Sequence, residues 1–147
     1  MKLTIDTALD AETFQHFRRF TDWGVPTRSS AALALRNSCL TLVARRDQSV
    51  VGITRMVGDG VLNAYVQDMI VDPAFRGRGV GRALIAYITH HFANRPHTDG
   101  LHIGLMSAHG MDGFYTACGF RARPNAGEGA GFQASLSSLV SHHGNGH

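Results

Sequence analysis

A turn rich in glycine and arginine, set between a strand-like segment and an amphipathic helical segment, constrains the fold of this chain most. Residues 63–71 alternate in hydrophobicity, as a half-buried strand does, and end before Asp72. In residues 79–92, apolar side chains recur at the 3.6-residue period of a helix. Between them, residues 76–82 hold three glycines and three arginines. A strand, a tight turn and a helix form the unit from which α/β domains are built.

The composition of this turn predicts an anion-binding site. Backbone N–H groups in the first turn of a helix lack intrahelical partners and carry partial positive charge. Glycines let an anionic group approach these amides closely, and arginines add cations whose geometry suits phosphate. We therefore predict that the turn binds a pyrophosphate. The residues expected to hold it are Arg76, Gly77, Arg78, Gly79, Val80, Gly81 and Arg82.

Two common phosphate-binding motifs do not fit this turn. A Walker A loop ends in Gly-Lys-Ser or Gly-Lys-Thr, which is missing here. A dinucleotide fingerprint needs glycine at position 82, where the chain has Arg82. A basic turn that binds nothing remains an alternative, although its glycines and like charges would then cost stability without a folding gain.

The rest of the chain predicts a single α/β domain with a mixed sheet over residues 1–137, followed by a disordered tail over residues 138–147. Three consecutive strands joined by tight turns precede a strand–helix–strand unit, which is expected to form a right-handed parallel crossover. The predicted strands cover residues 2–6, 39–44, 50–57, 63–71, 101–106, 120–123 and 132–136. The predicted helices cover residues 10–20, 27–36, 79–92 and 110–118.

The composition limits the class of protein further. The chain has 147 residues, 44% of them hydrophobic, which suits one folded domain. Its formal net charge of +3 is too small to indicate a nucleic-acid partner. Its two cysteines and nine histidines show none of the spacings typical of a disulfide framework or a metal site. The acidic first residues, and the lack of a run of about 18 apolar residues, predict a cytoplasmic protein without a membrane span.

Two motifs and their order resemble the GNAT superfamily of N-acetyltransferases, and in particular its small bacterial members. The first motif is R-x-x-G-x-G at residues 76–81, and the second is G-F-Y-x-x-x-G-F at residues 113–120. The resemblance covers residues 2–136. It implies a mixed central sheet of about six to seven strands with about four flanking helices, splayed between the fourth and fifth strands.

The resemblance also implies acetyl-CoA as co-substrate and no metal. The amides of residues 77–82 would hold the pyrophosphate, and the splay beside residues 101–106 would admit the cofactor. The pantetheine arm would pair with the backbone at the end of the preceding strand. The further residues expected to touch the cofactor are Met69, Ile70, Val71 and Phe114.

Acetyl transfer to an amine needs a neutral amine, donors for the oxyanion, and a proton for the leaving thiolate. By the resemblance, Tyr115 is the proton donor, because a phenol with a pKa near 10 can protonate a thiolate. Its alternative role is packing beside Phe114 and Phe120. The oxyanion donor is expected to be the backbone N–H of Met69 or Ile70.

By the resemblance, Asp68 is the candidate general base, because it is the carboxylate of the strand expected to pass under the acetyl group. Strand alternation puts it on the face of Val66 and Ile70. Gln67 stands where some family members carry a glutamate, and an amide is no base. Asp68 could instead brace a neighbouring strand.

The leading function is transfer of an acetyl group to the primary amine of a small molecule, by direct attack in a ternary complex. Acetylation of a protein N-terminus or lysine, and a CoA-binding sensor without catalysis, are alternatives. An exposed strand at residues 132–136 would allow a homodimer. The residues expected to line the acceptor pocket are Trp23, Asn63, Tyr65 and Gln67.

Overall fold

The structure, a computed structural model, describes residues 2–144. The chain divides into two compact units, one ending at Met106 and the other beginning at Ser107. No helix within the described residues combines the length and apolar character that a membrane span requires.

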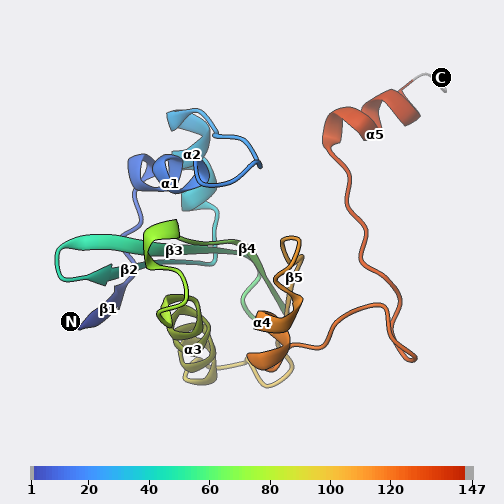
Figure 1. Cartoon of the computed structure of the whole chain (residues 1–147). Helices are drawn as coiled ribbons and strands as arrows, with labels where there is room; N and C mark the ends of the chain where they lie inside the picture. The colour runs from blue at the N-terminus through green and yellow to red at the C-terminus, as the bar shows by residue number, and fades with distance from the viewer. Residues whose placement is uncertain (1, 145–147) are drawn as a thin grey trace. The chain divides into compact units, whose positions relative to one another are not determined.

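The first unit is built on a mixed five-stranded sheet in the order β1-β2-β3-β4-β5 (Figure 1). The first four strands are antiparallel neighbours, and β5 runs parallel to β4. The mixed sheet and the parallel crossover are thus confirmed. The strands are β1 (Leu3–Asp6), β2 (Leu40–Arg46), β3 (Ser49–Gly58), β4 (Asn63–Val71) and β5 (His102–Leu105).

Helices cover both faces of this sheet, with α1 (Ala11–Arg18) and α2 (Arg28–Arg36) on one face and α3 (Val80–Ala93) on the other (Figure 1). The two N-caps predicted from sequence are present. Asp10 accepts a hydrogen bond from the Thr13 N–H at 2.8 Å, and Thr27 accepts one from the Ser30 N–H at 3.2 Å. The apolar stripes of the helices face the sheet. The core under α1 and α2 consists of Leu9, Phe14, Phe17, Ala31, Val43, Ile53 and Ile70.

A β-bulge interrupts the pairing of β3 with β4. Arg55 lies opposite Asp68, but the next residue of β3, Met56, lies opposite Val66, so Gln67 has no partner on β3. Adjacent residues of β3 face opposite sides of the sheet, and cross-strand partners share a face. Asp68 and Val66 therefore lie on opposite faces. The expectation that they share one is wrong, because strict alternation does not persist across a bulge.

The pairing of β4 with β5 stops before β4 ends. Their parallel pairing runs from Asn63 with His102 to Val66 with Leu105. β5 ends there, whereas β4 continues to Val71. The splay between the fourth and fifth strands is thus confirmed, and the edge of residues 67–71 lacks a β5 partner.

The second unit contains two helices, α4 (Asp112–Ala117) and α5 (Leu136–His143). The predicted strands at residues 120–123 and 132–136 are wrong, because the described part of this unit has only an isolated bridge between Asn125 and Glu128. Arg121 closes the first segment into a turn by donating from Nε to Glu128 at 2.9 Å. Ser135 ends the second segment by capping α5.

The sheet consequently has fewer strands than the family resemblance implied. Among residues 2–144 the structure has five strands and five α-helices, with a short 3-10 helix, η1 (Pro73–Phe75), after β4. Much of the segment predicted as a disordered tail forms α5, in which every residue is exposed. Residues 145–147 of that segment lie outside the described residues.

Candidate functional site

The glycine-rich turn leaves an open space at the N-terminus of α3. Gly77 and Gly79 adopt left-handed backbone conformations, with φ of +74° and +84°, which side-chain-bearing residues rarely adopt. A Cβ at either position would meet nothing within 4 Å. Gly79 is the N-cap of α3 and supplies no side-chain hydrogen bond to it. The amides of the first turn of α3 are therefore free to bind an anion.

Three exposed arginines surround this open turn, namely Arg76, Arg78 and Arg82. The guanidinium of Arg78 lies 5.6 Å from the ring centroid of Phe75. Among residues 2–144, no salt bridge neutralises any of the three. The open glycines, the free helix amides and the unneutralised cations fit a pyrophosphate group.

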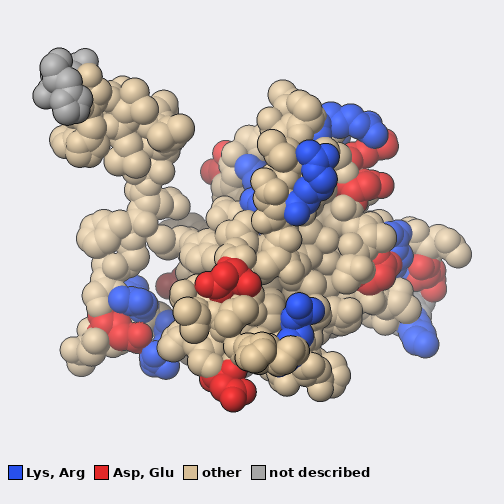
Figure 2. Space-filling model, turned by 180° about the vertical axis from the view of Figure 1, so that it is seen from behind, with Lys and Arg blue, Asp and Glu red and all other residues tan. Residues whose placement is uncertain are grey.

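Basic residues do not form a broad patch on the face shown in Figure 2, where they are interspersed with acidic ones. That face offers no extended basic surface of the kind that tracks a nucleic-acid backbone.

The unpaired edge of β4 leads directly toward this turn. Met69, Ile70 and Val71 are paired with β3 on one side only, through Thr54, Ile53 and Gly52 respectively. Their backbone groups on the other side can hydrogen-bond an extended ligand as an added strand would. After Val71 the chain passes through η1 into the glycine turn. The structure thus places the predicted pantetheine and pyrophosphate residues on consecutive segments.

Asp68 is fully buried and held by two arginines. Its Oδ1 lies 3.0 Å from Nη1 of Arg18 on α1, and its Oδ2 lies 2.7 Å from Nε of Arg55 on β3. Both carboxylate oxygens are therefore occupied, and the side chain joins α1, β3 and β4. This geometry favours the bracing role, while the role of base stays a prediction.

Sequence patterns did not single out Arg18 or Arg55. The available signal was Asp68 itself, because a carboxylate on an otherwise apolar strand requires a cation or several donors once buried. The sequence does not reveal which arginines supply that charge, since one of them lies 50 residues away.

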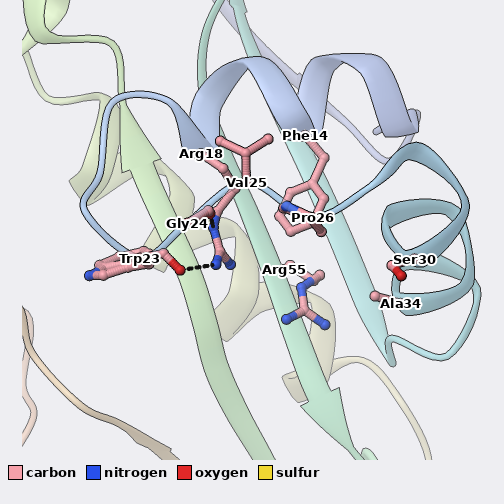
Figure 3. A pocket seen from close by; sticks show the side chains of 9 residues that line it. All are labelled: Phe14, Arg18, Trp23, Gly24, Val25, Pro26, Ser30, Ala34 and Arg55. Atoms are coloured by element: carbon pink, nitrogen blue, oxygen red, sulfur yellow. Dashed lines mark hydrogen bonds between the residues drawn. The ribbon is translucent and has the colours of Figure 1, made fainter.

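A pocket of about 380 Å³ opens beside this ion-pair cluster, between α1, the loop after it, α2 and β3 (Figure 3). Trp23 lines it, as predicted for the acceptor pocket. The other three predicted acceptor residues, Asn63, Tyr65 and Gln67, lie along β4 outside its lining. The lining residues are Phe14, Arg18, Trp23, Gly24, Val25, Pro26, Ser30, Ala34 and Arg55.

Tyr115 lies on α4 in the second unit. Its ring packs edge-on against Phe114 and Phe120, with centroid distances of 5.0 and 5.9 Å. Burial raises the pKa of the Tyr115 phenol, and the nearby Cys118 thiol raises this pKa further. The phenol therefore remains protonated at neutral pH, as a proton donor must. Both roles considered from sequence, proton donor and packing residue, are compatible with this environment.

Comparison with known proteins agrees with this arrangement. The family model for the acetyltransferase (GNAT) domain matches residues 37–122, more than half of the chain. GCN5-related N-acetyltransferase 1, chloroplastic, of Arabidopsis thaliana is 31% identical over 114 residues, which cover 74% of this chain and 56% of that protein. Serotonin N-acetyltransferase 2, chloroplastic, of Oryza sativa subsp. japonica is 34% identical over 89 residues, or 60% of this chain and 43% of that protein. This chain thus spans about half the length of these curated relatives.

A solved structure shows the same architecture. A GNAT family acetyltransferase from Streptococcus pneumoniae superposes with a TM-score of 0.66 and 26% identity, covering 82% of this chain and 86% of that one. The open turn, the splayed sheet and these matches agree, and the chain belongs to the GNAT superfamily of acetyltransferases.

Proposed function

We propose that this protein is an acetyl-CoA-dependent N-acetyltransferase that acetylates the primary amine of a small molecule in a ternary complex. The observation that carries the proposal is the open glycine turn at the N-terminus of α3, continuous with the unpaired edge of β4. Together they offer amides and cations for a pyrophosphate and a strand edge for the pantetheine arm.

The chain's own residues supply the binding and the proton transfer. The amides of residues 77–82, with Arg76, bind the pyrophosphate, and the edge at Met69, Ile70 and Val71 orients the arm. Phe114 adds an apolar contact. Bound acetyl-CoA supplies the activated acyl group as a thioester.

Two groups stabilise or neutralise the negative charges that develop on the oxyanion and on the thiolate during acetyl transfer. The N–H of Met69 or Ile70 donates to the oxyanion, and the Tyr115 hydroxyl gives its proton to the departing thiolate. The elevated pKa of Tyr115 supports this role, because a proton donor must be protonated at the working pH.

The size of the pocket beside Trp23 supports a small acceptor. Its volume of about 380 Å³ lies within the range of about 300–1,000 Å³ usual for small-molecule sites. Small amines also fit the name of the serotonin N-acetyltransferase relative. Acetylation of a protein N-terminus or lysine is the second candidate, and a CoA-binding sensor without catalysis is the third.

We also propose a cytoplasmic location and a homodimer, whose mass sedimentation analysis would measure. The strand edge expected to form the dimer is absent from the described residues. Instead, α5 and the segment before it expose apolar side chains, namely Phe132, Leu136, Leu139 and Val140.

Thiol release from acetyl-CoA, followed with a panel of small amines and lysine-containing peptides, tests the proposed activity. Release with small amines, together with acetylated product, is the expected result. Saturable CoA binding without thiol release from any amine would favour the sensor.

The Gly79→Ala variant tests the role of the turn. Alanine is strained at a φ of +84°, so the turn should distort and the KM for acetyl-CoA should rise about tenfold or more. The KM for S-acetyl-N-acetylcysteamine, a thioester without pyrophosphate, should stay unchanged. Gly60→Ala imposes a similar left-handed strain, at a φ of +71°, in the β3–β4 turn and serves as the control.

A further inference from the structure

The pocket beside Trp23 carries a net positive charge within an apolar and aromatic lining. Arg18 and Arg55 both line it, and the carboxylate of Asp68 beneath them neutralises one of the two charges. No acidic residue belongs to the lining. One positive charge therefore remains for a ligand. The ring of Phe14 lies close to both guanidinium groups, at 5.7 Å from Arg18 and 5.5 Å from Arg55.

The two arginines differ in how many of their donors are used. All three nitrogens of Arg18 are engaged, since Nε donates to the carbonyl of Gly24, Nη1 to Asp68 and Nη2 to the carbonyl of Trp23. Arg18 thus holds the loop that forms the pocket wall, as Figure 3 shows for Trp23. Among residues 2–144, Arg55 donates only from Nε, to Asp68.

The terminal nitrogens of Arg55 are available to a ligand. Within the described residues, neither Nη1 nor Nη2 of Arg55 has a hydrogen-bond partner, although its side chain is only 13% exposed. A largely buried guanidinium with a free edge favours a planar acceptor with two oxygens, which it binds through two parallel hydrogen bonds. A carboxylate has this geometry.

The ion-pair cluster also places the pocket near the reaction site. Asp68, which binds both arginines, lies on β4 directly after the bulge at Gln67. The edge that lacks a β5 partner begins at this same point of β4. Because Arg55 lies on β3 directly opposite Asp68, a ligand held by Arg55 lies one strand away from the stretch of β4 proposed to position the thioester.

We infer that Arg55 binds the carboxylate of the acceptor, and that the acceptor is an amino acid with an aromatic or large apolar side chain. Phe14, Trp23, Val25 and Pro26 provide the surface for that side chain. In the reaction, the amine nitrogen bonds to the acetyl carbonyl carbon as the carbon–sulfur bond breaks. The amine loses one proton and the thiolate gains one, giving an N-acetyl amino acid and free coenzyme A. The transfer step rests on the proposed function, whereas carboxylate binding by Arg55 does not.

Pairs of acceptors that differ only in the carboxylate test the inference. Phenylalanine and phenethylamine form one pair, and tryptophan and tryptamine form another. We expect kcat/KM to be about ten- to a hundred-fold higher for the amino acid of each pair, the usual worth of a hydrogen-bonded charge. Equal or higher kcat/KM for the decarboxylated amines would overturn the inference.

The Arg55→Lys variant tests the residue itself. Lysine keeps a positive charge beside Asp68 but loses the two-pronged geometry, so the preference for the amino acid should shrink about tenfold. The loss should appear in KM rather than in kcat. Arg45→Lys changes the other β-strand arginine that pairs with an aspartate, Asp6 on β1, outside the pocket, and should leave the preference intact. Thermal unfolding of both variants checks that they are folded.

Direct binding separates this inference from the proposed function. 3-Phenylpropanoate carries the ring and the carboxylate but no amine, and calorimetry should show that it binds the wild type about tenfold more tightly than Arg55→Lys. If it does so while no amine releases thiol, the proposed function fails and the carboxylate site stands. If amines release thiol but 3-phenylpropanoate binds neither protein, the carboxylate site is wrong and the proposed function stands.

Discussion

The sequence predicts Asp68 as the base and Tyr115 as the acid, but the two residues lie in different environments in the structure. Asp68 is buried between Arg18 and Arg55, with both oxygens taken. Tyr115 packs against two phenylalanine rings, and no hydrogen bond from its hydroxyl is present among residues 2–144. The first arrangement favours a structural role, whereas the second leaves a protonated hydroxyl for chemistry.

Replacing Asp68 by asparagine should lower the free energy of unfolding by about 3 kcal/mol, because two largely buried guanidinium groups lose their counter-charge. Urea denaturation measures this change. Asp72→Asn is the matched control, since asparagine can still cap η1 and stability should hardly change.

The pH dependence of kcat/KM for Asp68→Asn distinguishes a structural role of Asp68 from a role as general base. A general base must be ionised, so it produces a rate that falls as the pH is lowered. If Asp68 only braces the sheet, Asp68→Asn retains this acidic limb of the kcat/KM profile. If folded Asp68→Asn protein lacks the acidic limb that the wild type shows, Asp68 acts as the base.

Replacing Tyr115 by phenylalanine should reduce kcat about tenfold or more without changing the Kd for coenzyme A, because only the proton donor is removed. The ring and its contacts with Phe114 and Phe120 remain, so thermal stability should stay the same.

The pH dependence of the rate gives a second test of Tyr115, because a proton donor is lost as the pH rises through its pKa. Since burial raises the pKa of Tyr115, the wild-type rate should fall only above about pH 10, and the variant should lack this alkaline limb. Unchanged turnover would leave packing as the role of Tyr115.

The close contact of α3 with β3 links the packing of the sheet to the glycine-rich turn at residues 76–82. A Cβ at Gly52 would lie 2.8 Å from Cγ1 of Val80 and 3.5 Å from Cδ1 of Leu84. Val80 is the first residue of α3 and belongs to the turn. Because Gly52 has no side chain, the N-terminus of α3 packs directly against β3.

Gly52→Ala should therefore displace the start of α3. We expect a loss of about 1–3 kcal/mol in stability, as for other overpacked cores, and weaker binding of coenzyme A. Calorimetric titration with coenzyme A and urea denaturation measure the two effects. Gly100→Ala is the control, because its Cβ would meet nothing within 4 Å and both quantities should stay as in the wild type. Unaltered CoA affinity in a destabilised Gly52→Ala protein would show that the turn does not depend on this contact.

The charge of the whole chain is modest, but its arrangement around the turn should make cofactor binding sensitive to salt. The net charge is +3, and three exposed arginines lie in one turn of the chain. Added salt screens exposed charges, with a Debye length of about 10 Å at 0.1 M.

We accordingly expect the Kd for coenzyme A to rise steadily between about 0.05 and 0.5 M NaCl, a range over which the Debye length shortens about threefold. The KM for S-acetyl-N-acetylcysteamine should change little, because that thioester carries no phosphate. Equal salt dependence for both would argue against an anion site at residues 76–82.

Local sequence accounts for the elements of the first unit and for the conformation of the glycine-rich turn at residues 76–82. The helix caps at Asp10 and Thr27, the hairpin strands and the left-handed glycines at 77 and 79 each depend on contacts within a few residues. The second unit was less predictable. Its segments at 120–123 and 132–136 have strand-like composition. However, Arg121 donates to Glu128, and the Ser135 hydroxyl accepts from the Ser138 N–H, and these bonds turn the segments away from extended structure.

The sequence alone predicted an anion site at residues 76–82, because the spacing of glycines and arginines within a few residues encodes such a turn. The family resemblance added the strand edge beside it, and Asp68 stood out as a carboxylate that needs a partner once buried. The folded chain supplied what no local pattern contains. Asp68 meets Arg55 across 13 residues and Arg18 across 50, and a bulge at Gln67 determines which face of the sheet it occupies. These contacts depend on strand register and helix docking, which arise from the packing of the whole sheet, so the charge in the pocket beside Trp23 became visible only in three dimensions.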